Sequence, residues 1–130
     1  MSTKVYPIIL HPESEGGFYV NVPDLQIGTQ GEDLSDALLM ARDAIGQHFI
    51  CEQNAGRELP EPSLDLPSCT NGDIATFVDI DLAAYRRAHD QRTIHKNLTL
   101  PAWISYQAEE AGINFSQVLL EALKEKLNIQ

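Results

Sequence analysis

Basic residues are scarce in this sequence. Its 130 residues include 9 lysines and arginines against 19 aspartates and glutamates, which gives a formal net charge of −10. Because affinity for nucleic-acid phosphates comes mainly from Lys and Arg, the chain as a whole is not built to bind a nucleic acid through bulk positive charge. Its acidity indicates either a basic binding partner or simple solubility.

Cysteines and long apolar runs are scarce as well. Two cysteines, Cys51 and Cys69, do not make a disulfide framework. No apolar run approaches the roughly 20 residues that cross a membrane, and the opening residues MSTKVYPIIL lack the apolar region and small-residue cleavage site of a signal peptide. We therefore expect a cytoplasmic protein with reduced thiols and no membrane partner.

Motifs for catalysis and for cofactors are missing. The chain contains no phosphate-binding loop, dinucleotide motif or HExxH motif. His48 and Cys51 lie three apart on a predicted helix, but no second pair at metal-ligand spacing completes a site. We expect no catalytic residue, no metal and no cofactor. One enzymatic alternative stays open, an acidic nuclease in which Asp24, Asp79 and Asp81 gather around Mg²⁺.

The net negative charge lies entirely in the first part of the chain. Residues 1–90 contain 15 acidic and 5 basic residues, whereas residues 91–130 contain four of each. This change of composition predicts an acidic domain over residues 1–88, a hinge over 89–93 and a neutral domain over 94–130.

The first domain is expected to be an α+β unit of the order β-β-β-α-β-α. Strands are predicted over 3–10, 18–22 and 25–31, followed by a helix that Asp33 caps and that ends near Gly56. Apolar residues recur at steps of three and four along this helix, so that one face should pack on the sheet: Leu34, Ala37, Leu38, Ala41, Ala44, Ile45 and Phe49. A loop over 57–73, a strand over 74–80 and a short helix capped by Asp81 complete the unit.

The second domain begins with a strand that has no partner nearby in the sequence. The stretch HKNLTLPAW predicts a strand over 94–100, and two helices follow it. Pro101 is expected at the first position of the first helix, and Gly112 ends that helix. Asn114 with Gln117 predicts a capping box that begins the second helix.

A symmetric dimer solves the problem of the lone strand, because two copies of it can pair antiparallel across a two-fold axis. A shared core would then be built from the apolar side chains of both chains: Leu98, Leu100, Trp103, Phe115, Leu119 and Leu123. The outward side chains would form a ribbon that fits the major groove of DNA: His95, Asn97 and Thr99, with Lys96 beside them. The N–H groups around Asn114 to Ser116 would grip a phosphate. Because basic residues are few, DNA binding should favour cooperative dimers or a tetramer. The alternative is that this domain only dimerises and that its polar outer face does not bind DNA.

Residues 93–129 resemble the ribbon-helix-helix DNA-binding fold of bacterial repressors and antitoxins. A wider resemblance covers nearly the whole chain. The stretches "YPIILHPESEGGFYVNVPDLQIGTQGEDLSDALLMARDAI", "LPEPS", "VDIDLAAYRRA" and "NLTLPAWI…AEEAGINFSQVLLEAL" are similar to the HicB antitoxin family.

The HicB resemblance implies an antitoxin of a type II toxin–antitoxin pair. Its N-terminal domain, a fold related in part to double-stranded-RNA-binding domains and ribonuclease H, would bind HicA, a small basic toxin that cleaves mRNA. Its C-terminal domain would bind the operator and repress the operon that encodes both proteins. The other hypotheses are a stand-alone ribbon-helix-helix regulator and the acidic nuclease.

Overall fold

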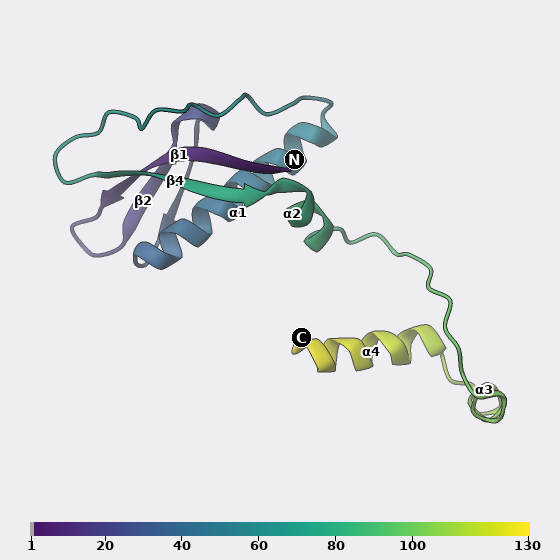
Figure 1. Ribbon diagram of the computed structural model, residues 1–130. Coiled ribbons are helices and arrows are strands. Elements are labelled where there is room, and N and C mark those ends of the chain that lie inside the picture. The colour runs from purple at the N-terminus through teal and green to yellow at the C-terminus, as the bar shows by residue number, and fades with distance from the viewer. Residues whose placement is uncertain (1) are drawn as a thin grey trace. The chain divides into compact units, whose positions relative to one another are not determined.

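The computed structural model describes residues 2–130 and divides the chain into two compact units, Met1–Gln91 and Arg92–Gln130. The division falls inside the segment 89–93 that the sequence predicts as a hinge. Figure 1 shows a sheet with helices in the first unit and helices without a sheet in the second. The mixed α+β composition confirms the fold class that the sequence predicts.

Four antiparallel strands form the sheet of the first unit, in the spatial order β3-β2-β1-β4. They are β1 (Thr3–Pro12), β2 (Phe18–Val22), β3 (Ile27–Gly31) and β4 (Ile74–Asp81). The turn between β1 and β2 uses Gly16 and Gly17, which have φ angles of 97° and 81°. These angles are accessible to glycine at little steric cost.

The third strand begins two residues later than the sequence predicts. Pro23–Leu25 form one turn of 3₁₀ helix, η1, and Gln26 then takes a left-handed conformation with φ of 55°. Proline at the first position of η1 starts the turn readily because its φ is already restricted to helical values. The chain therefore reaches an extended conformation only at Ile27.

Helix α1 (Leu34–Asn54) covers one face of the sheet and builds the core. The Asp33 side chain accepts a hydrogen bond from the Asp36 N–H at 2.8 Å, as predicted for its N-terminal cap. The predicted apolar stripe places three fully buried side chains on the sheet, while Leu34 at one end stays 45% exposed. The core cluster consists of Tyr6, Ile8, Leu10, Val20, Val22, Leu25, Ala37, Ala41, Ile45, Val78, Ile80 and Leu82.

Helix α2 (Leu82–Ala88) packs against α1 at a glycine. Asp81 caps α2 by accepting a hydrogen bond from the Ala84 N–H at 3.0 Å. The Tyr85 ring lies over Gly46 of α1, where an added Cβ would come within 2.5 Å of ring carbons. The Tyr85 hydroxyl donates to Asp43 Oδ1 at 2.6 Å, which holds the ring in place. Gly46, which costs helix stability on its own, therefore makes room for α2.

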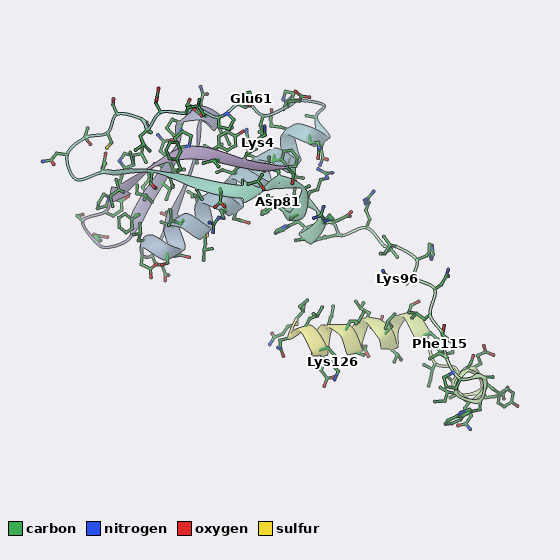
Figure 2. The ribbon with its side chains drawn as sticks, in the orientation of Figure 1. Lys4, Glu61, Asp81, Lys96, Phe115 and Lys126 are labelled. Atoms are coloured by element: carbon green, nitrogen blue, oxygen red, sulfur yellow. The ribbon has the colours of Figure 1, made fainter. Side chains whose placement is uncertain are left out.

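The segment 57–73 connects α1 to β4 and is tied to the sheet at several points. The Tyr6 hydroxyl donates to the Pro60 carbonyl at 2.8 Å. The Asp24 carboxylate accepts hydrogen bonds from both the backbone N–H and the hydroxyl of Ser63, at 2.7 and 2.8 Å. In Figure 2, Lys4 points from β1 toward Glu61, with 3.6 Å between Nζ and Oε1. A proline-containing loop is thus held in a defined path.

The second unit contains α3 (Ala102–Glu110) and α4 (Phe115–Leu127). Pro101 occupies the N-cap of α3, one position before the predicted one. Asn114 caps α4 by accepting from the Gln117 N–H at 3.0 Å, which confirms half of the predicted capping box. The Gln117 side chain donates to Glu121 Oε1 at 2.9 Å, and its return contact to the cap stays a prediction.

Replacing Gly46 with alanine tests the packing of α2. Alanine is favoured over glycine in a helix by roughly 1 kcal/mol, yet we expect Gly46→Ala to lower the melting temperature because its methyl group would collide with the Tyr85 ring. In a Tyr85→Ala background the same change should raise the melting temperature, and circular dichroism during heating measures both effects. Stabilisation by Gly46→Ala in the native background would contradict this packing.

Candidate functional surfaces

The predicted DNA-reading residues lie on the segment that joins the two units. Residues 90–101 are in neither a helix nor a strand, and His95, Lys96, Asn97 and Thr99 are all exposed. A β-ladder needs two strands, and no residue of the second unit is in a strand. The chain by itself therefore does not form the ribbon, and a strand that pairs across a two-fold axis stays a prediction about two chains.

The two leucines expected in a shared core are exposed in the single chain. Leu98 is 65% exposed and Leu100 is 50% exposed. Nothing else in the unit covers these two side chains. Their predicted burial therefore needs the same second chain that the ribbon needs. Alternation of exposed leucines with Asn97 and Thr99 along the sequence is the pattern of a strand with one apolar face.

The helices of the second unit also expose the residues predicted for the dimer core. Trp103 is 64% exposed, Phe115 42% and Leu123 49%, while Leu119 is half-buried. No residue from 92 to 130 is buried. A segment near 40 residues rarely sustains a core alone. This unit therefore has the composition of half an interface.

The start of α4 offers backbone donors for an anion. The Gln117 N–H is already occupied by Asn114, whereas the N–H groups of Phe115 and Ser116 belong to the first turn, where no intrahelical acceptor exists. In Figure 2 Phe115 marks this end of α4 and Lys126 lies toward the other. Positive side chains of α4 are therefore remote from the predicted phosphate contact, and backbone groups would have to supply it.

The acidic charge of the first unit includes three aspartates on and beside β4. A hydrogen bond from Thr70 and a further one from His11 lower the pKa of Asp73. The Arg42 side chain lowers the pKa of Asp79, to which it donates at 2.9 Å. Hydrogen bonds from Ser2 and from the Ala84 N–H lower the pKa of Asp81. All three carboxylates are consequently ionised at neutral pH.

A shallow groove lies between α1, β4 and α2, beside the C-terminal half of β4. Its volume is about 390 Å³, and it is lined by Arg42, Asp79, Ile80, Asp81, Ala84 and Tyr85. Reasoning from the sequence missed this groove because its residues come from three separate segments. The only sequence signal is the acidic pair Asp79 and Asp81, which the nuclease alternative takes as metal ligands.

The aspartates of the nuclease alternative do not converge on a metal site. Asp24 binds Ser63, Asp79 binds Arg42, and Asp81 caps α2. Across residues 2–130, no three His, Cys, Asp or Glu side chains come together in a way that could hold a metal ion. The same result leaves His48 and Cys51 without further ligands. The geometry gives the nuclease alternative no support.

No helix within residues 2–130 is long and apolar enough to cross a membrane. Cys51 and Cys69 are both free and exposed.

Known proteins resemble this chain along most of its length. The family described as "HicB_like antitoxin of bacterial toxin-antitoxin system" matches residues 6–122. Antitoxin HicB 1 of Photorhabdus laumondii subsp. laumondii is 42% identical over 60 residues, which span 44% of this chain and 39% of that relative. The match to this relative therefore covers well under half of its length.

One solved structure extends the likeness to both units. A chain of a "Toxin-Antitoxin complex from Streptococcus pneumoniae" superposes with a TM-score of 0.54 and 27% identity, covering 95% of this chain and 99% of that one. The antitoxin HicB of Burkholderia pseudomallei has a TM-score of 0.47 and 21% identity, with 96% and 97% coverage. Because the family match extends from β1 into α4, the chain belongs to the HicB-like antitoxins of bacterial toxin–antitoxin systems.

Proposed function

We propose that this chain neutralises a HicA-like, mRNA-cleaving toxin through residues 1–88 and represses its own operon by binding operator DNA through residues 94–130. Membership of an antitoxin family supports the first part. The similar Streptococcus pneumoniae chain belongs to a toxin–antitoxin complex. The acidic unit, with its excess of ten negative charges over residues 1–90, suits a basic RNA-binding partner.

Neutralisation in this proposal is steric. The first unit has no converging metal-ligand set among its described residues, and no chemistry of this chain is needed to block the toxin. A bound antitoxin covers the surface on which the toxin would receive RNA. Long-range attraction between opposite charges would speed the encounter of the two proteins.

The second unit in this proposal is one half of a ribbon-helix-helix dimer. The observation that carries it is a segment with alternating polar and apolar residues, followed by two helices that bury nothing in the single chain. Pairing two copies would cover Leu98 and Leu100 and present His95, Asn97 and Thr99 to the major groove. Lys96 and the backbone N–H groups at Asn114 to Ser116 would contact phosphates. Dimers on neighbouring sites would form a tetramer.

Two alternatives keep specific support. A dimerisation module that reads no DNA agrees with the balance of four acidic and four basic residues over 91–130. A stand-alone ribbon-helix-helix regulator would use the same outward residues without a toxin. Both are cytoplasmic proteins, as is the antitoxin, and operator binding and toxin binding measured separately distinguish the three.

Two neighbouring substitutions separate the reading of DNA from assembly. Asn97→Ala should leave the dimer folded and cost roughly 1–3 kcal/mol of operator discrimination for each lost base contact, twice per dimer. Leu98→Ala should instead destabilise the dimer by roughly 2–5 kcal/mol through a cavity in its core. Thermal unfolding, sedimentation and binding to DNA from upstream of the operon measure these effects.

Gln107→Ala, at an exposed position of α3, is the matched control and should change neither property. If Asn97→Ala dissociates the dimer while Leu98→Ala only weakens DNA binding, the strand faces the other way and the assigned residues are wrong. If all variants are dimeric and no DNA binds, the unit is a dimerisation module.

Toxin association should depend strongly on salt. Because exposed charges more than about 10 Å apart are screened at 0.1 M salt, raising salt from low to high concentration should slow association with the toxin by about tenfold or more. Stopped-flow mixing of full-length antitoxin with an inactive variant of the toxin encoded beside it measures this rate. An association rate that does not change with salt would assign the acidity to solubility alone.

A further inference from the structure

β4 is an open edge of the sheet. It pairs with β1 on one side only, over eight residues from Ile74 to Asp81. The opposite edge strand, β3, has five residues and includes two glycines, which weaken it as a template for pairing. β4 contains neither proline nor lysine, the residues with which proteins commonly protect an exposed edge. An unprotected strand of this length is suited to accept another strand.

One hydrogen bond shows which backbone groups of β4 face the open edge. Arg42 Nε donates to the Asp79 carbonyl at 2.8 Å, so the Asp79 backbone faces away from β1. Because backbone groups of successive strand residues point to alternate sides, those of Ala75 and Phe77 also face outward. Arg42 covers the edge at Asp79 and leaves the part before it uncovered.

The groove described above lies beside this edge. Asp79 and Asp81 on its wall belong to β4, and the side chain of Asp79 is 64% exposed. Figure 2 shows Asp81 at the end of β4, where the chain turns into α2. The apolar part of the wall comes from Ile80, Ala84 and the Tyr85 ring. A lysine or arginine stem can pack on this apolar wall while its charged end meets the carboxylates.

Charge decides between a second copy and a different partner. Two β4 strands paired antiparallel about Phe77 would place Asp73 of each opposite Asp81 of the other, and like charges directly opposite destabilise a sheet. Two units with ten excess negative charges each would also repel. An extended segment that carries basic side chains meets neither obstacle, and the carboxylates would attract it.

We propose that an extended segment of the cationic toxin adds to the sheet as a fifth strand beside β4, pairs with Ala75 and Phe77, and places a basic side chain in the groove at Asp79 and Asp81. This inference rests on the proposed function for the identity of the partner. It adds the docking surface, the mode of binding and the residues involved.

Amide hydrogen exchange of the full-length chain tests the mode of binding without any substitution. In the free protein the outward amides of Ala75 and Phe77 exchange quickly, while those of Thr76 and Val78 are protected by β1. Addition of the inactive toxin should slow exchange at Ala75 and Phe77 by about tenfold or more. Protection of other surfaces with no change at these two amides would overturn the proposal and leave toxin neutralisation intact.

A proline at the open edge provides the second test. Ala75→Pro removes an outward N–H and keeps the ladder with β1, so the chain should stay folded and bind toxin at least about tenfold more weakly. Ala75→Val, which retains the N–H, is the matched control and should bind like the native chain. Equal binding by both variants overturns the edge assignment. If the native chain binds no toxin, the proposed function and this inference fail together.

The dependence of amide exchange on protein concentration tests whether a second copy of the chain occupies the edge. If Ala75 and Phe77 become protected without toxin as the concentration of the chain rises, a second copy occupies the edge and the proposal is wrong. If the exchange result is positive but Ala75→Pro is found to be unfolded by circular dichroism, Phe77→Asn replaces it. Phe77→Asn weakens strand pairing on the exposed face and should likewise reduce toxin affinity.

Discussion

The contact between α1 and one face of the sheet is the interaction on which the first unit depends. Three small or branched side chains of the helix, Ala37, Ala41 and Ile45, are completely buried against the sheet. This contact determines which face of each strand is apolar. The helix covers a face and pairs with no strand, so the edge strands β3 and β4 each keep one unpaired side. The position of α1 also helps to form the groove. Arg42 and Gly46 lie on the side of the helix that meets β4 and α2.

The two units obtain their stability in different ways. The first buries a core of its own and can carry a surface of ionised carboxylates, because its apolar residues are already satisfied. In the second, Asn114 caps α4 whereas α3 has no side-chain cap, and a cap contributes only about 1 kcal/mol and does not replace a core. Its Trp103, Phe115 and Leu123 are left exposed in the single chain. Under the proposed function, pairing of two chains would cover them and would form the DNA-binding face at the same time.

Local signals in the sequence predicted much of this structure. Asp33, Asp81 and Asn114 each accept the capping hydrogen bond expected from their positions, because a cap involves residues only three apart. Two boundary predictions were wrong by one or two residues. The 3₁₀ turn delays β3, and Pro101 is the N-cap of α3 where the first helical position was predicted. A single chain cannot form the predicted ribbon, because its two strands are the same segment, 94–100, of two different chains.

The sequence by itself determined the periodicities, the caps and the division of charge, since these follow from neighbouring residues and from composition. Tertiary structure alone decided that β4 lies at an edge, that Arg42 reaches Asp79 and that Gly46 lies under Tyr85. Such contacts join distant segments, and the order of strands in a sheet depends on how the whole unit buries its apolar faces together. The same holds for Asp79 and Asp81. They line a groove that forms only when α1, β4 and α2 have packed together.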